Sequence, residues 1–211
     1  MASKRNGTAL LDRHEQILDA ALPCFAARGF HQTSMHDISA EAGISVGLIY
    51  RYFKSKEEVI AALAAEHKKA IAELLERAGQ ASTLLEAMEI LFTSHCTEQS
   101  PQIISAFVVD LFAEASRNER VAKILRNVVK TKADGVADLI ARSPEGRKLA
   151  PWLNAHQIAE MIFAVNDGTL MRSVFRSSKA SAARQRERQL DVARTLWRLL
   201  FSRTSHANGH N

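Results

Sequence analysis

The sequence has few of the residues on which disulfide-rich or membrane-embedded proteins depend. Its 211 residues include two cysteines, four prolines, two tyrosines and two tryptophans. Cys24 and Cys96 each lie within an apolar run, which favours reduced, buried thiols in a cytoplasmic protein over a disulfide scaffold. The longest apolar candidate, IISAFVVDLFA, is interrupted by Asp110 and is shorter than the roughly 18 residues that a membrane span needs. These absences favour a soluble chain with a conventional core.

Recognisable catalytic patterns are missing as well. The sequence has no nucleophile elbow, no glycine-rich phosphate loop and no His/carboxylate metal pattern, so we expect no enzyme and no cofactor. His95 and Cys96 have the chemistry of metal ligands, but adjacent residues on a helix point apart, so we expect no metal site there. The net charge of +5 is only a mild bias towards acidic partners such as nucleic acid.

Apolar residues recur at helical spacing throughout the chain, and no stretch alternates as strands do. The 46% content of hydrophobic residues is ample for a buried core. The sequence therefore predicts an all-α protein of about nine helices. They are expected over residues 12–29, 35–42, 45–52, 55–78, 82–98, 101–116, 118–142, 154–177 and 182–203. Pro23 should kink the first of them, because proline removes a backbone donor.

Two short helices joined by the segment AEAGIS are typical of a helix-turn-helix. Ser34 is expected to cap the first and, with Asp37, to complete a capping box. Gly43 supplies a left-handed stop, and Ser45 caps the second helix. The second helix would enter a major groove of DNA, so its exposed side has to be small or polar.

Both tyrosines follow within this second helix, in the stretch GLIYRYFKSKEE. The hydroxyls of Tyr50 and Tyr52 can donate to phosphates, and Lys56 can bind another phosphate at the start of the next helix. Taken in isolation, the two tyrosines would be interpreted as half-buried aromatics, but the order of the surrounding residues favours phosphate contact. Lys54 is interpreted as an ordinary solvated lysine at the start of a helix.

The segment TSMHDISAEAGISVGLIYRYFKSKEEVI resembles the DNA-binding signature of the TetR family of bacterial transcriptional regulators, over about residues 12–65. The resemblance implies phosphate contacts from Ser45, Tyr50, Tyr52 and Lys56, and backbone contacts near Thr33 and Ser34. It places Val46, Gly47, Leu48 and Arg51 on or beside the base-reading surface, with His36 able to reach bases. Because residues 46–48 have almost no hydrogen-bonding capacity, readout would depend on thymine methyls, His36, Arg51 and DNA shape.

The expected domains follow from this signature. Residues 1–11 are expected to be a flexible basic arm, since they lack the apolar centre of a signal peptide. Residues 12–56 form the helix-turn-helix DNA-binding domain, and 57–203 form a helical ligand-binding and dimerisation domain. The polar tail, 204–211, is expected to be disordered.

Bulky apolar residues and a few polar residues in the larger domain could line a cavity for a ligand. The candidates are Phe92, His95, Phe107, Asp110, Leu111, Glu114, Trp152, Phe163 and Asn166. Two polar residues within apolar runs, Asp110 and Asn166, could equally be a structural hydrogen-bonded pair or a dimer contact. If Asp110 and Glu114 face a pocket with aromatics, a cationic ligand follows.

The last two helices are expected to form a homodimer, with Gly168 allowing close approach. A two-fold dimer would present two helix-turn-helix domains to a pseudo-palindromic operator. Family behaviour implies a repressor released by a small-molecule effector. The basic 172–203 region is read as a solvated face, with a second DNA surface as the alternative. The rivals are a bundle that recruits a protein instead of a ligand, and a helical binding or transport protein with a coincidental motif.

Overall fold

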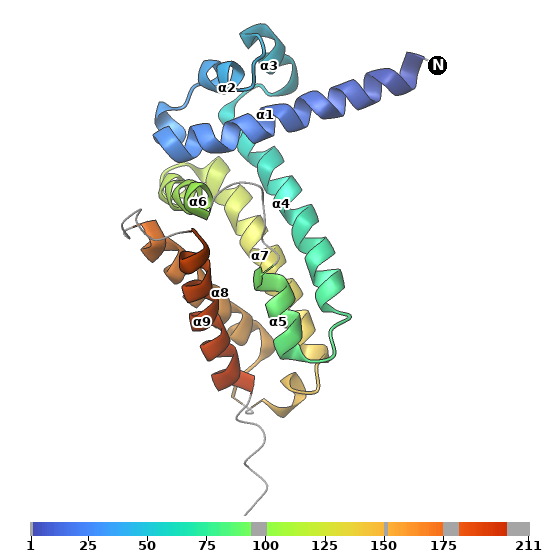
Figure 1. Cartoon of the computed structure of the whole chain (residues 1–211), viewed down its shortest axis with the longest axis vertical. Helices are drawn as coiled ribbons and strands as arrows, with labels where there is room; N and C mark the ends of the chain where they lie inside the picture. The colour runs from blue at the N-terminus through green and yellow to red at the C-terminus, as the bar shows by residue number, and fades with distance from the viewer. Residues whose placement is uncertain (1, 94–100, 150–151, 175–181, 202–211) are drawn as a thin grey trace, which may run out of the picture. The chain divides into compact units, whose positions relative to one another are not determined.

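The computed structural model describes residues 2–93, 101–149, 152–174 and 182–201 (Figure 1). Within these residues the chain forms nine α-helices and one short 3-10 helix, and it has no strand, so the expected all-α class is confirmed. The helices are α1 (Ala2–Gln32), α2 (Met35–Glu41), α3 (Val46–Tyr52), α4 (Lys56–Ala78), α5 (Leu84–Thr93), α6 (Pro101–Ala115), α7 (Glu119–Arg142), η1 (Gly146–Lys148), α8 (Ala155–Val174) and α9 (Ala182–Phe201). In this described part, none of the helices is both long and apolar enough to cross a membrane.

Contacts divide the chain into two compact units. Unit 1 comprises Met1–Glu66 and Gln102–Arg126, and unit 2 comprises His67–Pro101 and Asn127–Asn211. The division therefore differs from the expected boundary after residue 56, because α6 and the beginning of α7 pack with the N-terminal helices. Unit 1 is discontinuous in sequence as a result.

The first helix is longer than the sequence predicts. It begins at Ala2, where a flexible arm was expected, and not near residue 12. Extending an existing helix needs no new nucleation, and no proline interrupts these residues. Pro23 is accommodated within α1, and the non-helical residue is Gly29, with φ 75° and ψ 168°. Glycine tolerates a positive φ because it lacks a Cβ, so the chain turns there.

The core of unit 1 joins α1, α2 and α3 to the beginning of α4 and to α6 and α7. Its buried side chains include Ile17, Phe25, Ile38, Ile49, Phe53, Val59, Ile60, Leu111 and Val121. Ile49, the central residue of α3, is fully buried. Ile38 and Phe53 are buried beside it, and half-buried Ile44 packs against this core.

The core of unit 2 is formed by the end of α4 with α5, most of α7, α8 and α9. Its buried side chains include Leu74, Met88, Leu91, Val136, Ile140, Ile158, Ile162 and Trp197. Helix α9 packs against both α5 and α8. Gly135 of α7 lets this helix approach α4 closely, because a Cβ built there would lie 2.3 Å from Leu75 Cδ1.

Candidate functional site

The short helix α2 begins at a complete capping box. The side chain of Ser34 accepts from the Asp37 amide at 3.1 Å, and Asp37 Oδ2 accepts from the Ser34 amide at 2.8 Å. Hydrogen bonds from the side chain and then the backbone of Ser34, with a smaller effect of Arg28, lower the pKa of Asp37 to about 2. The predicted cap is confirmed, and Asp37 stays ionised at the positive end of the helix dipole.

A tight turn then orients α3. Gly43 has a φ of 64°, and the amide of Ile44 donates to the Ser39 carbonyl at 2.9 Å. Ser45 caps α3, since its side chain accepts from the Leu48 amide at 3.2 Å. The turn and the two caps are therefore closed by local hydrogen bonds, as the sequence predicts.

One face of α3 is buried and the opposite face is exposed. Ile49 anchors the helix, whereas Tyr50 is 44% exposed and Val46 is 36% exposed. Ser45, Gly47 and Arg51 are exposed as well, and His36 is exposed on α2. Nothing lies within 4 Å of a Cβ built at Gly47, so the surface is open at this point. These six residues form a small, polar surface on a rigid support, and we call it the α3 face.

Thr33 is not part of the α3 face. It is 1% exposed, and its hydroxyl oxygen lies 2.8 Å from the Gly29 carbonyl and 3.1 Å from the Cys24 carbonyl. Its amide also donates to the Gly29 carbonyl. The expected contact of Thr33 with a DNA backbone is therefore corrected: this residue closes the turn after α1. Ser34 remains exposed beside it.

The remaining predicted DNA contacts are less exposed. Leu48 and Tyr52 are half-buried, with Tyr52 packed against the core of unit 1. The Lys56 ammonium donates to the carbonyls of Phe30 and His31 and lies 4.4 Å from the centroid of the Phe30 ring. Burial lowers the pKa of Lys56. The two carbonyls use two of the three donors of this ammonium, and a phosphate contact from the third stays a prediction.

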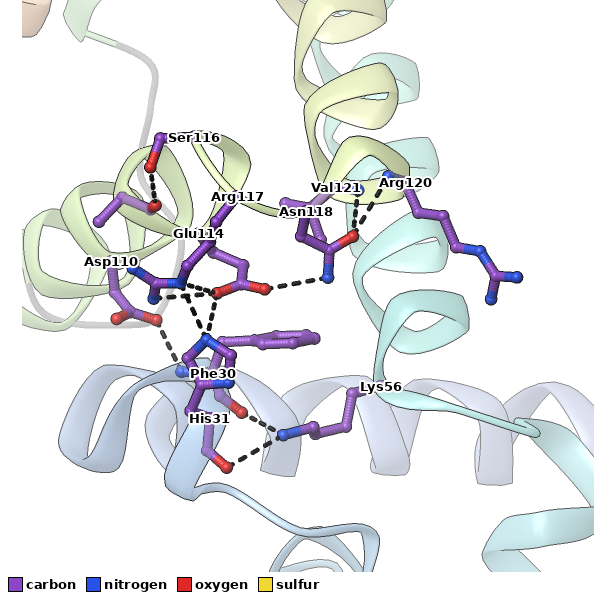
Figure 2. Close-up of polar contacts among 11 residues, drawn as sticks. Phe30, His31, Lys56, Asp110, Glu114, Ser116, Arg117, Asn118, Arg120 and Val121 are labelled. Carbon is purple, nitrogen blue, oxygen red and sulfur yellow. Dashed lines mark hydrogen bonds and ion pairs between the residues drawn. The ribbon is translucent and has the colours of Figure 1, made fainter.

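Two carboxylates of α6 hold the end of α1, as Figure 2 shows. Asp110 Oδ2 accepts from the Phe30 amide at 2.7 Å, directly after the turn at Gly29. A Cβ at Gly29 would lie 2.9 Å from Asp110 Oδ1. Asp110 therefore satisfies a backbone donor that the interrupted helix leaves without its usual partner.

Glu114 lies at the centre of a second set of contacts in the same view (Figure 2). Its side chain is 1% exposed; Oε2 lies 2.8 Å from His31 Nε2 and 3.0 Å from Arg117 Nη2. Asn118 Nδ2 donates to Oε1 at 2.9 Å. His31 Nε2 also lies 2.9 Å from Arg117 Nε, but one nitrogen cannot both donate to Glu114 and accept from Arg117. A protonated Nε2 and an Arg117 that donates to the carboxylate satisfy all of these groups.

These contacts correct the expectation that Asp110 and Glu114 face a ligand. Both carboxylates are bound by protein donors within unit 1, so the condition for a cationic ligand is not met. Phe107 and Leu111 also pack in the core of unit 1, and the Phe107 ring lies 6.0 Å from that of Phe25. Asp110 stands out in the sequence because it is polar within an apolar run, but its partner, Phe30, is 80 residues away in the sequence.

The other predicted ligand residues lie in unit 2, except His95, which is outside the described residues. Phe92 and Phe163 are 6.1 Å apart between ring centroids, and Asn166 is half-buried on the same helix as Phe163. Trp152 is 78% exposed, which does not fit a buried ligand contact. The structure thus brings together Phe92 and Phe163 and leaves the predicted set divided between the two units. Among the described residues no cluster of His, Cys, Asp and Glu could hold a metal ion.

Comparison with known proteins agrees with the geometry of α2 and α3. Residues 17–63 match the family model described as bacterial regulatory proteins, tetR family. The chain is 26% identical over 168 residues to the fatty acid metabolism regulator protein of Bacillus subtilis, covering 79% of this chain and 86% of that protein. It is 28% identical over 155 residues to the transcriptional regulator UidR of Escherichia coli K12, covering 74% and 78%. The resemblance to the TetR family is confirmed.

The fold comparison covers most of the chain. Salmonella enterica GusR matches with a TM-score of 0.72 and 25% identity, over 91% of this chain and 96% of that one. FadR of Bacillus subtilis in complex with stearoyl-CoA matches with a TM-score of 0.66 and 21% identity, over 85% and 96%. The family match and these named relatives identify the chain as a DNA-binding transcriptional regulator. The α3 face lies within the matched residues 17–63, and the assignment of a contact with DNA to a particular side chain stays a prediction.

Lys132 of α7 is a residue that the sequence did not single out. It is half-buried, and its ammonium lies 6.0 Å from the centroid of the Phe163 ring. A signal for it exists in the sequence. Lys132 stands four residues after Val128 and four before Val136, and both valines are buried, so the lysine interrupts an apolar stripe.

Proposed function

We propose that the chain is a repressor that binds a pseudo-palindromic operator as a homodimer and leaves it when a small-molecule effector binds unit 2. The observation that carries the DNA-reading assignment is the α3 face, a small and polar surface fixed by the Ser45 cap above buried Ile49. Such a helix can approach base edges closely without reorganising. We expect the protein to perform this role in the cytoplasm, where bacterial DNA lies.

Within the α3 face we assign two roles. Tyr50 would donate to a phosphate, since its hydroxyl is on the exposed side of the helix. Arg51, together with His36, would contact base edges, because a guanidinium can bind guanine through two hydrogen bonds. Val46 and Gly47 would lie against thymine methyls and the sugar edge, where small groups are needed.

The homodimer is proposed to form through α8 and α9. Met161, Val192 and Leu199 of these helices are large apolar side chains that are 38%, 45% and 59% exposed. A Cβ built at Gly168 meets nothing within 4 Å, so this face of α8 is open. A two-fold contact here would hold two α3 faces roughly one turn of DNA, about 34–36 Å, apart.

The test begins with selection of DNA fragments by the purified protein, which yields the operator. Tyr50→Phe should then weaken binding to all sequences alike, by about three- to tenfold for one lost hydrogen bond. Arg51→Ala should change which base is preferred, at a cost of about 1–3 kcal/mol at that base pair. Lys69→Ala, an exposed lysine further along α4, is the charge-matched control.

The outcome that contradicts the assignment is an equal effect of all three substitutions on every DNA sequence. Dimerisation is tested by Leu199→Glu, which should give a monomer in analytical ultracentrifugation and lose binding to the full operator. Leu85→Glu on α5, where the leucine is 36% exposed, is its control and should remain a dimer. If Leu199→Glu leaves a dimer, the α8 and α9 face is not the interface.

A further inference from the structure

Lys132 differs from the other lysines around it on α7. Lys130 is 74% exposed in its side chain and binds Asp134 at 2.8 Å, as a surface lysine does. Lys132 is half-buried, and no hydrogen bond or ion pair joins it to any residue that the structure describes. Its nearest recognised partner is the face of the Phe163 ring, 6.0 Å from the ammonium. A cation in this position is only weakly compensated.

The pKa shifts of Lys132 and Asp167 also indicate an ammonium that is only weakly compensated. Burial lowers the pKa of Lys132, and the charge of Asp167 on α8 offsets this only in part. Burial also raises the pKa of Asp167, which Lys132 and a hydrogen bond with Asn166 counteract. The two groups lie too far apart for an ion pair, so neither satisfies the other. An unpaired, desolvated ammonium costs free energy that an incoming anion would recover.

Aromatic side chains lead away from this ammonium. Phe163 lies 6.1 Å from Phe92, and Phe92 lies 5.1 Å from Trp197, measured between ring centroids. Trp197 is fully buried, and its Nε1 has no hydrogen-bond partner among the residues in the described part of the chain. The row of rings therefore has a hydrogen-bond donor without an acceptor at each end. Buried donors are nearly always paired, so acceptor atoms are missing from this cluster.

We propose that Lys132, Phe163, Phe92 and Trp197 form the effector site, and that the effector is an amphiphile with an anionic head. The head, a carboxylate or a phosphate ester, binds the Lys132 ammonium, and the apolar body packs along the three rings. This proposal rests on the proposed function and names the class of ligand. A cationic head is disfavoured because it would face Lys132 directly.

The test uses four probes with the same ten-carbon chain, each below its micelle concentration: decanoate, decyl phosphate, decanol and decyltrimethylammonium. The chain has two tryptophans, of which Trp152 is exposed, so Trp152→Phe leaves buried Trp197 as the single tryptophan reporter. Saturable changes in its emission should follow decanoate or decyl phosphate. Decanol should bind at least about tenfold more weakly, and the cation should not bind at all.

Three substitutions test whether the Lys132 ammonium binds the anionic head. Lys132→Gln should weaken decanoate or decyl phosphate binding by roughly ten- to a hundredfold, the loss of one charge-assisted contact. Lys130→Gln, two residues away and solvated, should leave it unchanged. Asp167→Asn removes the competing carboxylate and should strengthen the binding of both anions. This variant gains affinity, so it tests the site even if Lys132→Gln fails to fold.

Decanoate and decyl phosphate distinguish a carboxylate from a phosphate head, because the probe that binds with the higher affinity identifies the head group of the effector. Equal affinity for decanol and decanoate, equal loss in Lys130→Gln and Lys132→Gln, or no binding of any probe would overturn the proposal. Operator binding by the unliganded wild-type protein is measured alongside. If the protein binds its operator but none of the probes, this inference fails and the DNA-binding function stands. If the anions bind through Lys132 but no operator is found, the proposed function fails instead.

Discussion

The buried carboxylate of Glu114 offers a quantitative test of what holds unit 1 together. Glu114→Gln keeps the shape of the side chain and removes its charge. The amide of glutamine would also place a donor against Arg117 or Asn118, both of which are donors now. The variant should therefore loosen the contact between α6 and the end of α1 that Figure 2 shows.

The size of the effect follows from burial. Hydrogen bonds to a charged group contribute about 1.5–3 kcal/mol each, and Glu114 has three partners. His31 and Arg117 are 63% and 51% exposed, however, so water replaces much of what these two lose. We expect a loss of about 2–3 kcal/mol for Glu114→Gln, well below the sum, and about 3–5 kcal/mol for Glu114→Ala.

The assay is urea unfolding at neutral pH, followed by circular dichroism and by tryptophan fluorescence. Both tryptophans are in unit 2, whereas circular dichroism reports the helices of both units. With a slope of roughly 2–3 kcal/mol per M, the midpoint for Glu114→Gln should fall by about 1 M in circular dichroism. The control is Glu119→Gln, whose side chain is 81% exposed and pairs with exposed Arg126. If both variants shift the midpoint equally, the burial of Glu114 adds nothing to the stability of unit 1.

Three more predictions concern a cap and two glycines. The pKa of Asp37 is lowered from 3.8 to about 2 in the folded protein. The contribution of Asp37 to stability is therefore complete above about pH 4 and is lost as the pH falls towards 2. Ser34→Ala should raise this pKa in a carbon-detected NMR titration, and an unchanged pKa would contradict the effect of the Ser34 hydrogen bond. Gly29→Ala should lower the melting temperature by several degrees, about 1–3 kcal/mol, because its φ is +75° and a Cβ would lie 2.9 Å from a carboxylate oxygen; an unchanged melting temperature would refute this. Gly135→Ala should destabilise unit 2 because its Cβ would lie 2.3 Å from Leu75 Cδ1. Adding Leu75→Ala should restore part of the lost stability, whereas strictly additive effects of the two substitutions would exclude the contact.

The elements that the sequence predicts well are those with local causes. The capping box at Ser34, the left-handed Gly43 and the cap at Ser45 each depend on partners within four residues, and all three are confirmed. The exposed side of α3 follows from the same short-range pattern. Helix positions could therefore be predicted with errors of a few residues, apart from the start of α1.

Contacts between distant segments could not be predicted in this way. Asp110 and Glu114 look like pocket residues in the sequence because each is polar within an apolar run. Their partners, Phe30 and His31, are at least 80 residues away and become neighbours only when α6 packs on α1. Lys132 shows the converse, since a lysine on a charged helix is normally solvated, and only the packing of α7 against α8 reveals that it is not.

The discontinuity of unit 1 matters for anyone who wants to graft this DNA-reading module onto another protein. A fragment that stops at Glu66 would leave behind Gln102–Arg126, and with it the side chains that close the end of the first helix. Chimeras cut at a single junction should consequently be poorly soluble or bind DNA weakly. A transplant that also carries the sixth helix and the start of the seventh keeps the module whole.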